Sequence, residues 1–336
     1  MNDMARQDTP ALVLDKVTKE YSQWQRSGET KDIIRNLLRP EKKVVTALDQ
    51  VSLVINSGEF VAYAGANGAG KSTTIKILSG ILTPTKGGVT VLGLNPLKDR
   101  IPLMRRVGVL FGQRTELWWD HPVITSFQWK KDVWNIPDQV YEKNLHMVTE
   151  LLDLSDILKT FARELSLGQR MRADIAMLLL HGPELIFLDE PTLGLDVLAK
   201  QQMIGFLKKL NKEYGTTVVV TSHDMDDLEE MAQRVVFINK GKIAFDGDFD
   251  SLRSVMGGFY RILVTTQPGI PALSLPEMKL LHSENDVHEY EFDRTKVPIH
   301  EVLGNLSNYS QILDLEIKKA PIEDVVASLY LSWKEK

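Results

Sequence analysis

Apolar runs and segments of helical spacing alternate through the first two thirds of the chain. Three of the runs, at residues 60–64, 185–188 and 216–221, are apolar or β-branched without polar alternation. Such runs are typical of strands that are buried on both faces of a mainly parallel sheet, in which helices form the crossovers. The pattern therefore predicts an α/β domain with these three strands at its centre.

The pattern becomes helical from about residue 115 to about residue 170. Tyr141, Leu145, Val148 and Leu152 follow one another at spacings of four, three and four, so they fall on one face of a helix. We interpret this stretch as a helical subdomain that is inserted into the sheet domain.

A second change of pattern comes at about Asp250. The strands that we predict beyond it are residues 261–265, 288–292 and 313–317, and the helices are residues 299–306 and 322–329. The second helix begins behind Pro321, a residue that is common at helix starts. We therefore expect a large domain over residues 11–250 and a small α+β domain, in the order β-β-α-β-α, over residues 251–336.

Composition narrows the class of protein. The 336 residues include 40 Lys and Arg against 45 Asp and Glu, a net charge of −5 that gives no basic footprint for nucleic acid. The chain has no cysteine, which excludes disulfides, thiolate metal sites and a cysteine nucleophile. No apolar run reaches the ~20 residues that cross a bilayer, and the polar residues 1–10 lack a signal-peptide core. We therefore expect a cytoplasmic protein.

Residues 65–72, Gly-Ala-Asn-Gly-Ala-Gly-Lys-Ser, fit the phosphate-binding pattern GxxxxGK[ST]. They follow a predicted buried strand and precede a helical run, which is the context that the pattern requires. Glycines let backbone N–H groups converge on phosphate oxygens, and the helix N-terminus adds its positive end. In this chemistry Lys71 contacts the β- and γ-phosphates and Ser72 binds Mg²⁺.

Two carboxylates, Asp189 and Glu190, end the predicted strand at residues 185–188. Acids at strand ends are common and usually only solvated. Beside a phosphate-binding loop, however, Asp189 suits a role at Mg²⁺ and Glu190 suits the orientation or deprotonation of an attacking water.

A further motif connects these residues to a known family. Residues 165–169, Leu-Ser-Leu-Gly-Gln, resemble the LSGGQ motif of ABC-type ATPases. The other motifs of the family occur in its order: Gln113 resembles the Q-loop glutamine, residues 194–196 the D-loop, and His223 the switch histidine. Tyr21 lies where the family's adenine-stacking aromatic would be, although a packed aromatic is an equal alternative.

The resemblance spans about residues 11–250 and implies a P-loop NTPase of ABC type, with a mainly parallel core sheet, an antiparallel β subdomain and a helical insertion. It implies ATP and Mg²⁺ as ligands. The catalytic residues that it implies are Glu190, His223, Gln113 and Lys71. The implied nucleotide-binding residues are Tyr21, Gly65, Asn67, Gly68, Gly70, Lys71, Ser72, Thr73, Ser166, Gly168 and Gln169. The implied metal ligands are Ser72, Gln113 and Asp189.

In this family the LSGGQ segment contacts the nucleotide that a second copy holds, so two ATP molecules lie between two antiparallel protomers. The resemblance therefore implies a homodimer with two composite sites. One residue departs from the motif, because Leu167 stands where the family has its first glycine. We expect Ser166 and Gly168 to make the contact, the Leu167 side chain to point away from the γ-phosphate, and coupling or rate to change rather than binding.

Two other segments are conspicuous. Trp118 and Trp119 are consecutive and cannot both face one core, so one of them is expected to be exposed. In the family this region faces the membrane-embedded partner, which suggests a docking site over residues 115–123, with local packing as the alternative. The basic insertion at residues 22–43 resembles an extra helix of polysaccharide-exporter ATPases, or else it is a solvated basic loop.

The sequence thus resembles the ATPase subunit of an ABC transporter. The resemblance implies that a separate permease holds this subunit at the inner face of the membrane. The insertion, the Leu-Ser-Leu-Gly-Gln motif and the paired tryptophans most resemble the ABC-2 export class, so we expect an exporter with an ABC-2 type permease as its partner. One alternative is a surface-polysaccharide exporter ATPase. A second is a soluble ABC ATPase that acts on ribosomes or DNA.

Overall fold

The structure of the chain is a computed structural model. It describes residues 9–24, 42–112, 115–255, 259–274, 277–294, 296–309, 311–326 and 329. The chain divides into two compact units, Met1–Asp246 and Gly247–Lys336. Among the described residues, no helix is both long enough and apolar enough to span a membrane.

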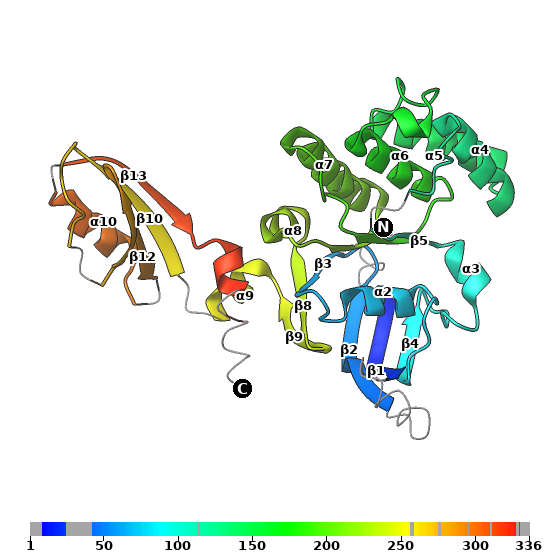
Figure 1. Cartoon of the computed structure of the whole chain (residues 1–336), viewed down its shortest axis with the longest axis horizontal. Helices are drawn as coiled ribbons and strands as arrows, with labels where there is room; N and C mark the ends of the chain where they lie inside the picture. The colour runs from blue at the N-terminus through cyan, green and yellow to red at the C-terminus, as the bar shows by residue number, and fades with distance from the viewer. Residues whose placement is uncertain are drawn as a thin grey trace, which may run out of the picture. The chain divides into compact units, whose positions relative to one another are not determined.

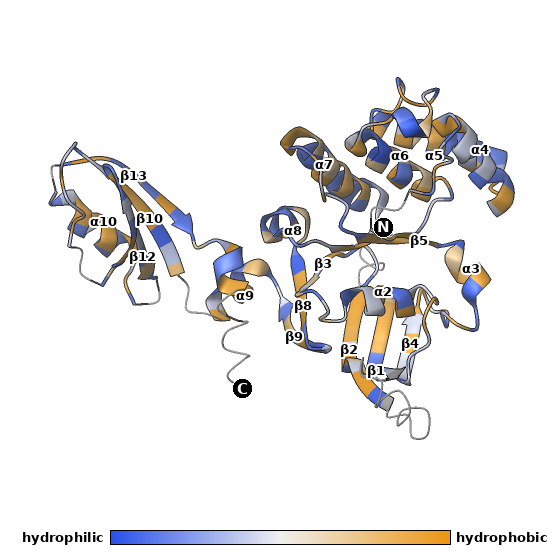
Figure 2. Cartoon of the chain, viewed as in Figure 1, coloured by the Kyte–Doolittle hydropathy of each residue, from blue (hydrophilic) through white to orange (hydrophobic). Residues whose placement is uncertain are grey.

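A six-stranded sheet forms the centre of the first unit, in the order β5-β6-β7-β3-β8-β9. Its strands are β3 (Phe60–Gly65), β5 (Val107–Leu110), β6 (Leu185–Asp189), β7 (Thr217–Thr221), β8 (Arg234–Asn239) and β9 (Lys242–Gly247). From β5 through β6, β7 and β3 to β8, each strand is parallel to the next. β3, β6 and β7 are almost wholly buried. The structure thus confirms the predicted α/β class, because apolar runs without alternation occupy the buried centre of the sheet (Figures 1 and 2).

A second sheet in this unit is antiparallel and has the order β2-β1-β4. It consists of β1 (Pro10–Trp24), β2 (Lys42–Asn56) and β4 (Lys86–Val91). β1 and β2 remain paired up to Trp24 and Lys42, so both ends of the expected 22–43 insertion belong to strands instead. The rest of that insertion lies outside the described residues.

One helix, α2 (Lys71–Leu78), packs between the two sheets. Ile75, Ile77 and Leu78 of α2 belong to the same buried cluster as Leu14 of β1 and Phe187 of β6. The short α3 (Arg100–Met104) follows, and α7 (Val197–Tyr214) and α8 (Met225–Met231) lie across the core sheet from α2 (Figure 1). This packing fixes the start of α2 at the carboxyl end of β3.

The helical subdomain contains α4 (Val123–Trp134), α5 (Asp138–Leu151), a short 3-10 helix (Ala162–Glu164) and α6 (Leu167–Leu179). On α5 the predicted stripe is buried at Tyr141 and Val148, and Leu152 directly after the helix is buried as well. Leu178 of α6 packs on Gly108 of β5, where a Cβ atom would lie 2.4 Å from Leu178 Cδ2. The glycine therefore allows α6 to sit closely on the core sheet.

The second unit contains a four-stranded antiparallel sheet in the order β11-β12-β10-β13. Its elements are α9 (Phe249–Val255), β10 (Phe259–Thr266), β11 (Lys279–Glu284), β12 (Val287–Asp293), α10 (Ile299–Ser307) and β13 (Ile312–Lys319), followed by helical residues 322–326. The predicted β-β-α-β-α order missed α9 and β11. β11 is an edge strand whose residues are all exposed, so it carries no alternation between apolar and polar positions.

Candidate functional site

The phosphate-loop residues and the acidic strand end line one cleft of about 250 Å³. The lining residues are Ala47, Ala66, Asn67, Gly68, Gly70, Lys71, Ser72, Thr73, Asp189, Glu190 and His223. Nine of these were singled out from the sequence. Ala47 and Ala66 were not, because alanine carries no polar group that would mark it as a ligand residue.

Local backbone geometry explains the glycines of the loop. Gly70 is the N-cap of α2 with φ +118°, and a Cβ atom there would lie 2.8 Å from the Ala47 carbonyl oxygen. Gly68 also has positive φ, +79°, and nothing lies within 4 Å of the place where its Cβ would be. Both positions therefore need glycine for their conformation, and Gly68 leaves open space at the cleft. The N-terminus of α2 opens into the same cleft, where its free N–H groups can bind an anion.

The Lys71 side chain folds back over the loop. Its Nζ donates hydrogen bonds to the carbonyl oxygens of Gly65 at 2.6 Å and Ala66 at 3.3 Å. Burial lowers the pKa of Lys71, while the carboxylates of Glu190 and Asp189 act in the opposite direction. Gly65 thus holds the lysine through its backbone and is not itself among the residues that line the cleft.

Asp189 and Glu190 are fixed by their neighbours on β7. Thr221 Oγ1 donates a 2.6 Å hydrogen bond to Asp189 Oδ1, and the Glu190 backbone N–H donates to the Thr221 carbonyl oxygen at 3.0 Å. Glu190 has φ +58°, a left-handed conformation that is unusual for a residue with a side chain. These bonds hold that strained backbone in place at the mouth of the cleft.

Glu190 and His223 are in direct contact. His223 Nε2 lies 3.1 Å from Glu190 Oε1, and the His223 backbone N–H donates to Glu190 Oε2 at 3.3 Å. Burial raises the pKa of Glu190, and the nearby His223 partly opposes that shift. A carboxylate with a raised pKa beside a phosphate loop can accept a proton from water, the property of a general base.

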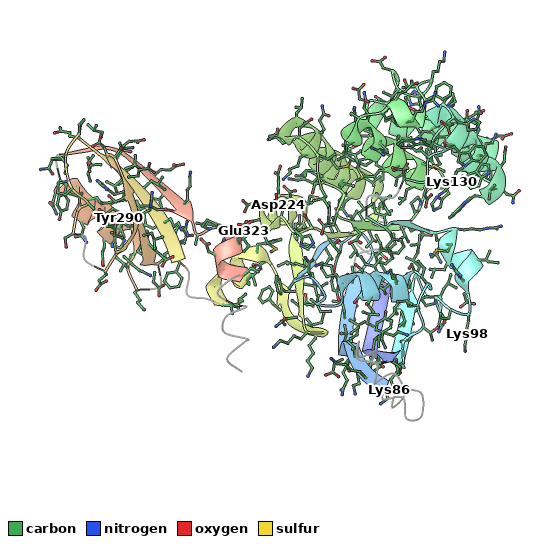
Figure 3. All side chains as sticks on the ribbon, viewed as in Figure 1. Lys86, Lys98, Lys130, Asp224, Tyr290 and Glu323 are labelled. Atoms are coloured by element: carbon green, nitrogen blue, oxygen red, sulfur yellow. The ribbon has the colours of Figure 1, made fainter. Side chains whose placement is uncertain are left out.

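The His223 segment is tied to α7. Lys200 Nζ of α7 lies 2.7 Å from Asp224 Oδ2, directly after His223, and 3.0 Å from Asp227 Oδ1 (Asp224 is labelled in Figure 3). Sequence reasoning missed this link, because Lys200 is part of no motif.

Ser166, Gly168 and Gln169 do not line the cleft that contains Lys71. Ser166 is the N-cap of α6: Gln169 N donates to Ser166 Oγ at 3.2 Å, and Ser166 N donates to Gln169 Oε1 at 2.9 Å. Leu167 is the first helical residue, and it is not among the described residues with positive φ. The replacement of glycine by leucine therefore causes no backbone strain at this position.

One predicted residue remains apart from this site. Tyr21 lies on β1, paired with Val45 of β2, and it does not line the cleft, although Ala47 of β2 does. Lys19 Nζ lies 5.1 Å from the centroid of the Tyr21 ring. Gln113 lies outside the described residues.

An exposed aromatic surface is built on the helical subdomain; we call Trp118, Trp119 and Trp129 the tryptophan surface. These side chains are 37%, 49% and 38% exposed, so both members of the pair reach solvent, not one. The ring centroids of Trp118 and Trp129 are 5.4 Å apart, and the Arg170 guanidinium lies 5.3 Å from the Trp119 ring centroid. The Trp118 and Trp129 rings thus pack on one another, the Trp119 ring contacts Arg170, and all three remain accessible.

A larger cleft of about 700 Å³ lies elsewhere in the first unit, between α3 and the end of α4. Lys98, Arg100 and Arg105 line it together with Ile101 and Trp134. It contains no carboxylate and no residue of the phosphate loop, so it is not the place for the chemistry described above.

Comparison with known proteins agrees with this geometry. The family model described as ABC transporter matches residues 48–193. The methionine import ATP-binding protein MetN of Carboxydothermus hydrogenoformans is 30% identical over 302 residues, 87% of this chain and 86% of the relative. ABC transporter A family member 1 of Dictyostelium discoideum is 33% identical over 253 residues, and there the match spans only 28% of the relative.

A solved structure resembles the chain as well. It is a dimeric ATP-binding cassette in a post-hydrolysis state, bound to ADP and Pi, with a TM-score of 0.58 and 26% identity. The match covers 70% of this chain and 98% of that cassette. The phosphate loop, the Glu190–His223 pair and these similarities lead to one conclusion: the chain belongs to the family of ABC transporter ATP-binding proteins and is an ATPase.

Proposed function

We propose that the chain is the ATP-hydrolysing subunit of an ABC-2 type exporter, and that it works as a homodimer bound to a membrane-embedded permease. The observation that carries the catalytic part is the contact between Glu190 and His223 across the cleft that contains the phosphate loop. The observation that supports binding to a permease is the tryptophan surface.

The residues of the cleft fit magnesium ATP. Loop N–H groups and Lys71 would hold the phosphates, and Ser72 and Asp189 offer the oxygen ligands that Mg²⁺ prefers within that cleft. Bound there, Mg²⁺ would neutralise charge on the phosphate oxygens. Glu190 would take a proton from the attacking water, while His223 orients the carboxylate. Gln113 would act as a third metal ligand and as a catalytic residue, as the family resemblance implies.

Surface chemistry supports the homodimer. Leu193, Val197 and Leu198, around the D-loop, are 45%, 74% and 66% exposed. Such apolar residues beside a polar site are typical of an interface. In a two-fold dimer, Ser166, Gly168 and Gln169 of one copy would complete the site of the other. Tyr21 of β1 would then stack on the adenine.

The tryptophan surface is the proposed permease contact, within the docking segment at residues 115–123. Exposed aromatic side chains that pack on one another form anchors with little loss of side-chain entropy. The subunit would then lie at the inner face of the membrane, held there by the permease.

Import is a second candidate for the direction of transport. The MetN relative is by name an importer subunit, and its match extends over most of this chain, beyond the ATPase unit. Export is supported by the Leu-Ser-Leu-Gly-Gln motif and by the tryptophan pair after the Q-loop.

The test starts with the identification of a permease gene next to the gene for this chain. The two proteins are co-purified and reconstituted into liposomes with ATP on the outside, so that an exporter loads cargo into the lumen and an importer removes it. Replacement of Trp118 and Trp119 by alanine is expected to weaken binding to the permease by at least about tenfold. Unchanged binding would rule out the docking site, whereas ATP-dependent capture of ribosomes or DNA would indicate the soluble class of ABC ATPase.

A further inference from the structure

A buried carboxylate lies in the middle of α6, and the function described above does not use it. Asp174 is only 7% exposed, and its neighbours Ala173 and Ile175 are fully buried. A carboxylate in such surroundings costs free energy unless hydrogen bonds compensate it. Its presence therefore calls for specific partners.

Those partners belong to the segment that leads to the tryptophan surface. Asp174 Oδ1 accepts hydrogen bonds from Thr115 Oγ1 at 2.9 Å and from the Glu116 backbone N–H at 3.0 Å. Thr115 Oγ1 in turn accepts from the Leu117 N–H at 3.1 Å. One carboxylate oxygen thus fixes the beginning of residues 115–119 to α6.

A second contact lies one helical turn earlier. Arg170, four residues before Asp174, places its guanidinium over the ring of Trp119. Ser166, the N-cap of the same helix, precedes Asp174 by eight residues, or about two turns. A helix this short is rigid, so a displacement of residues 115–119 reaches the Ser166 end of α6 directly.

The far side of the segment is held by α4. Ser126 Oγ accepts from the Trp118 N–H at 2.9 Å, and Lys130 Nζ lies 3.3 Å from Glu116 Oε2 (Lys130 is labelled in Figure 3). These bonds fix the segment within the helical subdomain but do not involve α6. The link to α6 therefore depends on Asp174 and Arg170.

We infer that Asp174 is a positioning residue that couples the tryptophan surface to the Ser166 region, because it fixes residues 115–119 to α6. A partner on the tryptophans then moves the N-terminus of α6, and the arrival of a nucleotide at that N-terminus moves the tryptophans in return. The inference rests on the proposed function, in which Ser166 meets the nucleotide of the second copy.

The first experiment measures steady-state ATP hydrolysis by the full chain. Asp174→Leu removes the acceptor at similar size, Thr115→Val removes the donor, and Asp174→Asn keeps an oxygen at the same place. Thr149→Val is the matched control, since the buried Thr149 hydroxyl has no hydrogen-bond partner among the described residues. We expect Asp174→Leu and Thr115→Val to lower kcat by about tenfold with the KM for ATP within about twofold. Asp174→Asn and Thr149→Val should leave both constants within about twofold of the parent.

Equal kcat in Asp174→Leu and the parent would overturn the inference. So would a fall in Asp174→Asn as large as in Asp174→Leu, because the charge and not the acceptor would then matter. If Asp174→Leu does not fold, Thr115→Val alone decides, since it removes the same bond from the other side.

A second experiment does not depend on hydrolysis. The chain has no cysteine, so Trp118→Cys introduces a unique thiol whose labelling rate with a maleimide reports the position of the segment. Without nucleotide, we expect Asp174→Leu to raise that rate by at least about threefold and Asp174→Asn to leave it unchanged. Equal rates in all three would contradict the coupling. A parent chain that neither binds nor hydrolyses ATP would refute the proposed function instead, and the labelling result would still stand.

Discussion

Glu190 combines three properties that the residue type alone does not provide. It has a left-handed backbone, its pKa is raised by burial, and it contacts His223. The strained backbone directs the carboxylate toward the phosphate loop, and the raised pKa suits it to accept a proton. Each property comes from the tertiary structure around the end of β6.

Replacement of Glu190 by glutamine keeps the shape and removes the proton acceptor. We expect kcat for ATP hydrolysis to fall by at least about 100-fold, while ATP binding remains, because Lys71 and the loop are unchanged. Hydrolysis is measured by phosphate release, and binding is measured with a fluorescent ATP analogue. Glu213→Gln, at an exposed position of α7, is the control. Hydrolysis at the parental rate would show that Glu190 is not the base.

Site residues whose type is set by the chemistry of phosphate binding could be predicted from the sequence. Residues whose role depends on tertiary contacts could not. Gly68, Gly70 and Lys71 follow from the backbone and charge that a phosphate requires, and the structure brings them into one cleft. The pairing of Lys200 with Asp224 joins two helices that no spacing rule relates. Leu167 departs from the family pattern, which has glycine at this position. In the structure it is the first residue of α6, a position that does not require glycine.

At the scale of elements, buried strands could be predicted and exposed ones could not. The bounds of β3, β6 and β7 agree with the predicted ranges to within one residue, because burial on both faces requires an apolar run. β11 is a fully exposed edge strand and was missed. β1 and β2 extend into the expected insertion because their backbones pair up to Trp24 and Lys42, which no apolar pattern there indicated.

The stability of α6 and its neighbours is expected to depend on pH through Asp174. Burial raises the pKa of Asp174 to about 6; Glu116 adds to this shift, and Thr115, the Glu116 N–H and Arg170 oppose it. A carboxyl with a raised folded-state pKa binds more protons when folded. The free energy of unfolding therefore decreases as pH rises from about 4 through about 6.

Asp174→Asn removes this dependence and keeps the acceptor oxygen. We expect the variant to be more stable than the parent by on the order of 2 kcal/mol at pH 7.5, and by less at pH 5, where the parent carboxyl is largely protonated. Urea unfolding of both proteins at the two pH values measures the difference. A larger gain at pH 5 than at pH 7.5 would contradict the assigned direction of the pKa shift.

At the scale of the whole molecule, each compact unit has its own buried core. Ile75, Tyr63 and Phe187 belong to the cluster of the first unit, whereas Tyr290 and Phe292 belong to that of the second. The cleft that contains the phosphate loop lies in the first unit. A ligand stabilises the unit that binds it, so ATP should raise the unfolding temperature of the first unit and leave that of the second unchanged.

Phe292→Ala in the full chain separates the two cores. Phe292 is 1% exposed, and its truncation leaves a cavity that costs about 3–5 kcal/mol, enough to move the unfolding transition of the second unit to lower temperature. Scanning calorimetry with and without magnesium ATP should show the other transition unchanged and still stabilised by nucleotide. Val287→Ala, at a 40% exposed position of the same strand, serves as the control and should shift neither transition. If both transitions moved together in Phe292→Ala, the two cores would unfold as one cooperative body, and the second unit would be a structural part of the ATPase unit.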